Sequence, residues 1–469
     1  MIQGTWFRQR SYAHFDRSLS EKEALSLVRD PKKIVQHAFW PLIVRPITSV
    51  YREDSGNGRR ITKTKKRPIA YAAHSDSHIY AYYATLVYSK LEDEYQKFPL
   101  CQEAVLAYRA FPESKNNINF AYETFVHIQK KKYCEVIALD VAGFFDTLDH
   151  SLLKTAWQNL LGCNSLPEDH YAVFKACTRS YGIELSTLRE IFKNDVRTKR
   201  GRDNAKVCTS KEFRGKVVPE IKPLQILVNE IKGKKPSVNA SKGIPQGLSI
   251  SAVLANLYML EADKELTTYM NQLGGIYRRY SDDILLIVPT GKGDEAEKKV
   301  IDTLECLKLK IQDEKTKRVI VSSKDDDGKE LEIIDVFSKL PETVSYLGFE
   351  FDGSNIFVRP SSVSSFMIMA NRAIHVAKIR AIKNEQTLKK RKLYTRLTSL
   401  GYGKAYGNVG DYCQKDLPSG IPRLGFFNYL SNAEKIINSV ALSKQKEQIK
   451  NRVIREIKDA ENEVKEQLG

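Results

Sequence analysis

Residues 276–288 read IYRRYSDDILLIV, two short β-prone runs joined by Ser281, Asp282 and Asp283. This pattern predicts a β-hairpin that carries two adjacent carboxylates at its turn. Neighbouring carboxylates repel each other, and their burial is costly unless they are paired or bind a metal ion. A plain turn is the alternative, because Asp is common in turns. The aspartate pair alone therefore does not establish a metal site.

A third acidic residue, Asp140, ends the apolar run YCEVIALDV at residues 133–141, which we expect to be a buried strand. Two Mg²⁺ ions roughly 4 Å apart can clamp the attacking and leaving oxygens of a phosphoryl transfer. Carboxylate oxygens suit this hard ion. Asp140, Asp282 and Asp283 converge only if the chain folds to bring them together. We expect them to form one catalytic group that binds two magnesium ions.

The segment GIPQGLSIS at residues 243–251 stands directly before a helical run. Its glycines, Gly243 and Gly247, allow a backbone to approach a base pair closely. We expect Gln246 to touch the incoming nucleotide. A generic glycine-containing loop that enters a helix is the alternative for this segment taken alone.

The order of these motifs resembles that of reverse transcriptases. ALDVAGFFDTLDH (138–150) resembles their first catalytic motif, GIPQGLSIS their template and nucleotide-positioning loop, and YSDD (280–283) their Tyr-x-Asp-Asp box. Three further segments resemble the fingers segment, the active-site lysine segment and the primer-grip hairpin: KKRPIAYAAHSD (65–76), LKLKIQDEKTK (307–317) and YLGFEF (346–351). The resemblance spans about residues 60–360. It implies an α+β right-hand polymerase with fingers, a palm built on an antiparallel sheet flanked by helices, and an α-helical thumb.

The resemblance also implies roles for the acidic motif residues. Asp140 and Asp282 would bind metal directly, and Asp283 would complete the acidic cluster. The backbone carbonyl of Val141 would also touch a metal ion.

Nucleotide contacts follow from the same resemblance. Arg67 would meet the triphosphate through its planar fork. Phe145 stands at the family's steric gate, where its ring would clash with a ribose 2′-OH and favour dNTPs; a core aromatic is the alternative. Lys315 would protonate the pyrophosphate leaving group, and a surface lysine is the alternative. The sequence leaves open which neighbour makes a second contact: Arg60, Lys63, Lys65 or Lys66.

We expect three domains: N-terminal helices and fingers at 1–135, a palm at 136–360 and a helical thumb at 361–469. The palm carries a basic insertion at about 194–240, and its residues 194–235 hold 12 basic and five acidic residues. We interpret it as a loop over the nucleic-acid path, with a solvated loop as the alternative. The thumb contains KKRK (389–392), and we expect it to grip the backbone of a duplex.

Periodicity predicts most of the helices and strands. We expect helices over 17–45 (with a capping box of Ser20 and Glu23), 76–96, 117–131, 151–162, 167–192, 248–270 and 293–309. We expect strands near 317–322 and 344–358, and helices from 361 onward that are interrupted near 401–403 and 418–422. Residues 54–67 predict a basic loop or hairpin whose turn comes from Gly56 and Gly58.

The chain carries 75 Lys and Arg against 57 Asp and Glu, a net charge of +18 that favours an anionic partner such as nucleic acid. Solubility alone is the alternative. Seven scattered cysteines without a CxxC pair argue against zinc and fit free thiols in a reducing compartment. No apolar run of 18 residues and no apolar signal core occur, so we expect no membrane span and a cytoplasmic location.

Among reverse transcriptases, the bacterial defence-associated kind (abortive-infection and unknown-group enzymes) gives the best match. AYRAF (107–111), DHYAVFKACTRSYG (169–182) and the basic insertion resemble that group, whereas group II intron enzymes usually have Ser-Pro at Leu248-Ser249. The resemblance implies antiphage defence, a dedicated non-coding RNA template, dNTPs and a DNA product. A homo-oligomer or an accessory defence protein is a further expected partner. The alternatives are a retron-type or group II intron-like reverse transcriptase, an RNA-dependent RNA polymerase and a catalytically idle RNA-binding scaffold.

Overall fold

The computed structural model describes residues 6–10, 12–54, 60–111, 114–193, 206–235, 241–324, 330–398 and 425–468. Several sequence expectations lie outside these residues: Gly56, Gly58, Cys413 and the interruptions at 401–403 and 418–422. The chain divides into two compact units. The first unit holds Met1–Ala110 and Ile137–Thr316, and the second holds Phe111–Val136 and most of the chain after Lys317. The predicted division into three domains stays a prediction.

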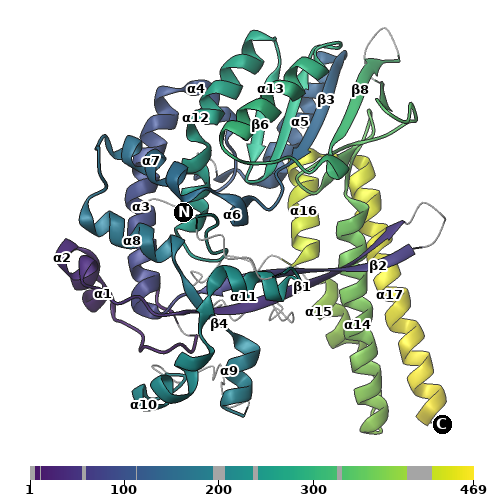
Figure 1. Cartoon of the computed structure of the whole chain (residues 1–469). Coiled ribbons are helices and arrows are strands. Elements are labelled where there is room, and N and C mark those ends of the chain that lie inside the picture. The colour runs from purple at the N-terminus through teal and green to yellow at the C-terminus, as the bar shows by residue number, and fades with distance from the viewer. Residues whose placement is uncertain are drawn as a thin grey trace. The chain divides into compact units, whose positions relative to one another are not determined.

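A long antiparallel hairpin dominates one sheet of the first unit (Figure 1). Its strands are β1 (Leu42–Asp54) and β2 (Arg60–Tyr71), and the sheet order is β2-β1-β4-β5 with β4 (Tyr181–Glu184) and β5 (Lys222–Pro223). The hairpin predicted near 54–67 is thus confirmed and is longer than expected. The helix predicted up to residue 45 is wrong beyond Val35, where α2 ends, and the apolar run from Leu42 pairs on both sides as a strand.

A second set of strands in the first unit carries the aspartates. β6 (Ile276–Tyr280), β7 (Asp283–Val288) and β3 (Cys134–Asp140) are neighbours in the order β6-β7-β3. β6 and β7 pair in an antiparallel hairpin whose last pair is Tyr280 with Asp283. All three predicted strands are confirmed, and the apolar runs of β3 and β7 are buried along most of their length.

Helices surround these sheets in the first unit. They are α1 (Glu21–Val28), α2 (Pro31–Val35), α3 (His74–Lys97), α4 (Pro99–Ala104), α6 (Phe144–Thr147), α7 (His150–Leu161), α8 (Glu168–Thr178), α9 (Leu185–Ile191), α10 (Ser210–Glu212), α11 (Leu224–Ile231), α12 (Ser251–Gln272) and α13 (Gly293–Cys306). The capping box of Ser20 and Glu23 forms at the start of α1, as predicted. α12 is the central helix, because it packs against α3, α4, α7, α13 and β6. Its buried face includes Leu254, Leu257 and Leu266.

Two predictions in this unit are corrected. The helix expected over 167–192 breaks after Thr178, because residues 181–184 leave the helix to form β4 beside β1. The insertion at 194–235 is not simply a loop in its described part. Residues 224–231 (LQILVNEI) form the amphipathic α11, which buries Leu224, Leu227 and Ile231.

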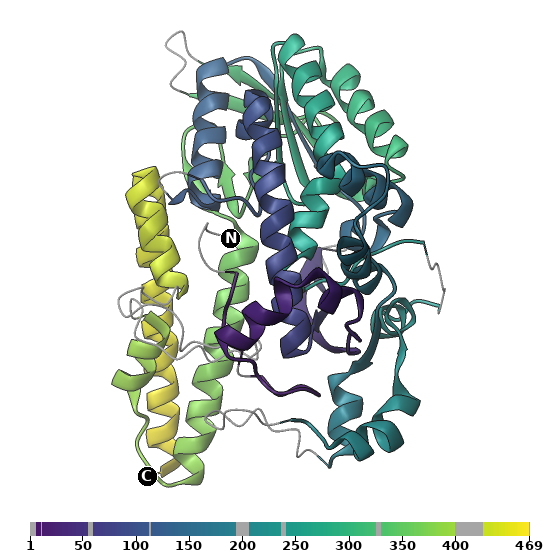
Figure 2. The same ribbon diagram turned by 90° about the vertical axis from the view of Figure 1, so that its left-hand side faces the viewer.

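The second unit joins small sheets to a helical bundle. Its helices are α5 (Asn117–Lys131), α14 (Pro360–Lys383), α15 (Lys390–Thr398), α16 (Phe426–Ile437) and α17 (Val440–Leu468). Its strands are β8 (Lys317–Ser323), β9 (Leu331–Asp335), β10 (Val344–Tyr346), β11 (Phe349–Phe351) and β12 (Ile356–Val358). The helices α14, α15 and α17 lie side by side in both whole-chain views, with α17 in yellow (Figures 1 and 2). Phe366 stacks on Phe426 at 4.4 Å, so the aromatic cluster of α16 belongs to a core.

Together the elements confirm the predicted mixed α+β class. None of the helices in the described part of the chain has the length and apolarity that a membrane crossing requires. Within the described ranges, six cysteines are free thiols: Cys101, Cys134, Cys163, Cys177, Cys208 and Cys306.

Candidate active site

The β3 terminus and the β6–β7 turn bring two of the predicted catalytic aspartates together. Asp140 is the last residue of β3, Asp282 lies in the turn, and Asp283 begins β7. The amide of Val141 donates a hydrogen bond to the backbone carbonyl of Asp282 at 3.1 Å. This bond ties the residue after Asp140 directly to the turn. Asp140 and Asp282 are half-buried and Asp283 is exposed, so all three carboxylates are accessible.

A third segment, residues 310–315, closes over Asp140. The amide of Gln312 donates to the carbonyl of Asp140, and the amide of Ala142 donates to the carbonyl of Lys310, both at 2.8 Å. The Lys315 ammonium lies 3.0 Å from the Asp140 carboxylate oxygen Oδ2. The predicted role of Lys315 places it in this site, and the structure shows it there as the ion-pair partner of Asp140.

Two cations of the β1–β2 hairpin share one face of their strand. Lys65 and Arg67 are exposed and stand two residues apart on β2, hence on one face of the strand. Partial burial lowers the pKa of Lys65, and the positive charges of Lys315 and Arg67 lower it further. The carboxylates of Asp140 and Asp282 act in the opposite direction on the same pKa. Lys65 therefore lies within electrostatic range of Asp140, Asp282 and Lys315, whereas the sequence could not choose it from its neighbours.

The GIPQG loop packs against both β2 and α6. The amide of Ala70 on β2 donates to the carbonyl of Gln246 at 2.7 Å. Gly247 has a φ of +111°, and a Cβ built there would lie 2.4 Å from the Ala70 carbonyl oxygen. Gly243, with a φ of +87°, would likewise bring a Cβ within 2.8 Å of the Asp146 carbonyl. The two glycines are therefore required because the loop lies very close to the backbone of Ala70 and Asp146. Their predicted close approach to a base pair stays a prediction.

Phe145 lies on α6, beside this loop. Its carbonyl accepts a hydrogen bond from the amide of Ile244 at 2.8 Å, which fixes α6 against the GIPQG loop. The ring is partly buried against the main hydrophobic core and is not enclosed by it. Phe145 thus has one side on the core while the other remains accessible. This position is compatible with both interpretations from the sequence, a steric gate and a core aromatic.

The donor atoms fit a magnesium ion. In the described part of the chain, no three His, Cys, Asp or Glu side chains are grouped closely enough to hold a metal. Mg²⁺ does not require such a cage, since it is usually bound by one or two carboxylates together with waters and substrate phosphates. Asp140 and Asp282, linked through Val141, offer oxygens of the required kind. Asp283 and the Val141 carbonyl stand next to them in the chain.

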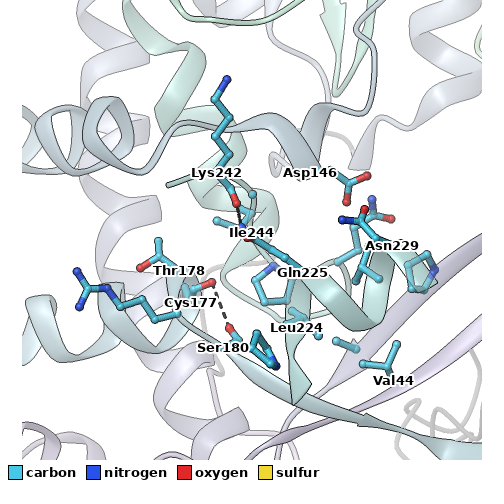
Figure 3. A pocket seen from close by; sticks show the side chains of 18 of the residues that line it. Val44, Asp146, Cys177, Thr178, Ser180, Leu224, Gln225, Asn229, Lys242 and Ile244 are labelled. Carbon is cyan, nitrogen blue, oxygen red and sulfur yellow. Dashed lines mark hydrogen bonds between the residues drawn. The ribbon is translucent and has the colours of Figure 1, made fainter. Parts of the chain in front are cut away.

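An open cavity of about 710 Å³ lies beside the GIPQG loop (Figure 3). Its walls come from β2, α6, the α8–β4 connection, α11 and the GIPQG loop, and Gln246 is one of its lining residues. Leu224 and Val44 lie on its apolar side, and Asp146 lies near Asn229 on another (Figure 3). The rim is basic: Arg179, Lys234, Lys235 and Lys242. The Asp146 carboxylate itself is paired with Lys232.

Comparison with known proteins agrees with this geometry. Residues 207–351 match the family model of reverse transcriptases (RNA-dependent DNA polymerases). Over these residues, which make up less than a third of the chain, the sequence is similar to reverse transcriptases, as the order of the motifs already indicated. The matched stretch includes Gln246, Asp282, Asp283 and Lys315, whereas Asp140 and the fingers hairpin lie before it.

Solved structures similar to this chain include yeast telomerases. Apo telomerase from Candida tropicalis, truncated from the C-terminal domain, is 12% identical over 71% of this chain and 59% of its own, with a TM-score of 0.39. Telomerase from Candida albicans with a TWJ fragment of telomeric RNA is 10% identical over 92% of this chain and 66% of its own, with a TM-score of 0.35. The chain thus spans less than two thirds of the length of these structures. No curated protein matches the sequence.

Proposed function

We propose that this chain is a reverse transcriptase that extends a primer with dNTPs on an RNA template. The observation that carries the proposal is the meeting of Asp140 with the Asp282 turn, within electrostatic range of Lys65. Nucleotide addition needs two groups: carboxylates that hold a metal cation, and positively charged side chains that hold the triphosphate.

The residues would act in distinct ways. Asp140 and Asp282 would hold the metal ions, helped by Asp283 and the Val141 carbonyl. When bound, two Mg²⁺ ions would neutralise the developing charge on the attacking and leaving oxygens. Arg67 would clamp the triphosphate with its planar fork, and Lys65 would add a second positive charge.

Lys315 would change partners during the reaction. In the structure its ammonium pairs with Asp140 at 3.0 Å. Lys315 would turn from Asp140 to the triphosphate, where its ammonium would donate a proton to the departing pyrophosphate. A positioned lysine ammonium can act as a general acid.

The basic cavity beside Gln246 would receive the unpaired template strand. Its rim of lysines and Arg179 suits phosphates, and its apolar wall suits a nucleobase. Phe145 would stand against the sugar of the incoming nucleotide and exclude the ribose 2′-OH. Selection of dNTPs would make the product DNA.

We propose further that the enzyme copies a dedicated non-coding RNA in the bacterial cytoplasm during defence against phage. This part rests on the resemblance of residues 107–111 and 169–182 to defence-associated enzymes, and on the net charge of +18. Sequencing the nucleic acid that co-purifies with the protein would test it. A single enriched RNA with its complementary DNA is expected, and random cellular RNA would contradict it.

Primer extension tests the polymerase itself. The wild-type chain should extend an RNA-templated primer with dNTPs in Mg²⁺ and should use NTPs poorly. Equal use of NTPs would favour an RNA-dependent RNA polymerase. Protection against phage by a chain with Asp282→Asn and Asp283→Asn would favour an idle RNA-binding scaffold.

A further inference from the structure

Arg279 is a buried cation directly before the catalytic turn. It stands on β6, two residues before Ser281, and its side chain is 0% exposed. A buried charge is costly unless it is paired and its hydrogen-bonding groups are satisfied. Replacing a buried ion pair by apolar side chains is often neutral or stabilising, so stability alone does not account for an arginine here.

The guanidinium binds in two directions. Toward α12 it forms a two-pronged ion pair with Asp263, with Nε–Oδ1 at 2.7 Å and Nη2–Oδ2 at 2.5 Å. Toward the turn, Nη1 donates to the backbone carbonyl of Ser281 at 3.1 Å. Nη1 also donates to Oδ1 of Asn256 at 3.2 Å. Asp263 and Asn256 lie seven residues apart on α12, hence on one helix face.

The turn that receives this bond is strained. Ser281 has a φ of +63°, in the left-handed region that favours glycine. Such a residue persists only where its surroundings hold it. Two contacts hold Ser281: Arg279 binds its carbonyl, and the Tyr108 hydroxyl lies 3.1 Å from its Oγ.

The segment 105–108 belongs to the same network. The amide of Leu106 donates to the carbonyl of Arg279 at 2.9 Å, and Asn256 Nδ2 donates to the carbonyl of Ala107 at 2.9 Å. Backbone and side chain of Arg279 are therefore both fixed from outside β6. The guanidinium is left with one orientation, which points at the turn.

We infer that Arg279, locked by Asp263, is a positioning residue that holds the Ser281–Asp282 turn in the conformation that presents the catalytic carboxylates. It acts through the Ser281 carbonyl and touches neither substrate nor metal. The catalytic consequence of this inference rests on the proposed function. Its structural part, that the guanidinium fixes the conformation of the turn, does not depend on the proposed function.

The neighbouring Arg278 provides a matched control. It points to the opposite face of β6, is partly exposed, and donates to the carbonyl of Glu103 at 2.9 Å. Arg278→Met removes the same charge from the same strand without touching the turn. Any effect that belongs to charge or strand propensity would appear in this variant as well.

The test replaces the pair together, as Arg279→Met with Asp263→Leu, so that no unpaired charge stays buried. Hydrogen exchange of the Val141 amide, which bonds to the Asp282 carbonyl, reports on the turn without requiring polymerase activity. We expect it to exchange about tenfold faster or more in the double variant, with a retained thermal transition. In primer extension the Mg²⁺ concentration for half-maximal rate should rise severalfold. Arg278→Met should leave both the exchange rate of the Val141 amide and the Mg²⁺ concentration for half-maximal rate unchanged.

Arg279→Lys serves if the double variant does not fold. Lysine keeps the charge for Asp263 but lacks the fork that also reaches the Ser281 carbonyl. It should show the same faster exchange. Unchanged Val141 exchange in whichever of these variants folds would overturn the inference. An inactive wild-type chain would instead refute the proposed function and leave the exchange result to decide the inference by itself.

Discussion

The amide of Val141 lies 3.1 Å from the carbonyl oxygen of Asp282. One hydrogen bond thus joins two motifs that are separated by more than a hundred residues in the chain. This bond holds two acidic segments that are distant in the sequence together in one site. The predictions below concern the groups that surround this junction.

Lys65 should matter for nucleotide binding more than its neighbour Lys66. Lys65→Ala is expected to raise the dNTP KM about tenfold, because it removes one charge-assisted contact to the triphosphate. Lys66→Ala, one position along β2 and on its other face, should change KM little. Steady-state primer extension at varied dNTP concentrations measures both. Equal effects of the two variants would refute the choice of Lys65.

Phe145 should control the choice of sugar. Phe145→Ala removes the ring that is proposed to meet the 2′ position, so NTP incorporation relative to dNTP should rise at least about tenfold. Phe145→Tyr retains a ring of the same width and should retain discrimination. Single-nucleotide incorporation with dNTP and NTP gives the ratio of kcat/KM. An unchanged ratio in Phe145→Ala would assign this ring to the core alone.

Gly247→Ala should disable the site by a backbone clash. The new Cβ would lie 2.4 Å from the Ala70 carbonyl oxygen, so the GIPQG loop must move away from β2. Gly291 offers a control, since its φ is +87° and a Cβ there meets nothing within 4 Å. Gly291→Ala should cost only about 1 kcal/mol of conformational strain. We expect a large loss of kcat/KM for Gly247→Ala alone, and similar activities of the two variants would contradict the clash.

Stability should fall as the pH is lowered from 7 to 5. Burial lowers the pKa of His78 from 6.5 to about 4, with a further lowering by Arg10. The folded chain therefore keeps this ring neutral, while the unfolded chain binds a proton near pH 6.5. The stabilisation is complete above that pH and declines toward pH 4, with a loss of about 2 kcal/mol at pH 5.

Urea unfolding at the two pH values measures this loss. His78→Gln should reduce the difference between them, because glutamine does not titrate. The exposed His375 provides the control, and His375→Gln should leave the difference unchanged. If the pH dependence of stability is as large in His78→Gln as in the wild-type chain, other groups cause it.

Local pattern predicted much of the fold because the relevant elements are strongly periodic. The strand that ends at Asp140, the β6–β7 hairpin and the helix Asn117–Lys131 appear where the sequence placed them. The apolar run from Leu42 was ambiguous, since a short apolar run fits a helix end or a strand equally well. Its strand pairing is decided partly by β4, which lies far away in sequence.

Strand geometry explains what the sequence missed in the site. Lys65 and Lys66 look alike in sequence, but once residues 60–71 are known to form a strand, its two-residue period puts Lys65 on the same face as Arg67. In the same way, the sequence does not distinguish Arg278 from Arg279, and only the folded structure shows which of them is buried. The sequence did indicate that one of these two arginines is buried. Consecutive residues of a strand point to opposite faces, so one arginine of β6 had to lie on the face that the helices cover.

The most direct test of the central claim is Asp140→Asn compared with Asp302→Asn in single-turnover primer extension. Asp302 is an exposed acid of α13 outside the site, so its variant controls for the loss of one negative charge. The account predicts that Asp140→Asn lowers the rate by at least about a thousandfold while the chain stays folded. Asp302→Asn should retain the wild-type rate. An Asp140→Asn enzyme that extends the primer as fast as the wild type would contradict the account.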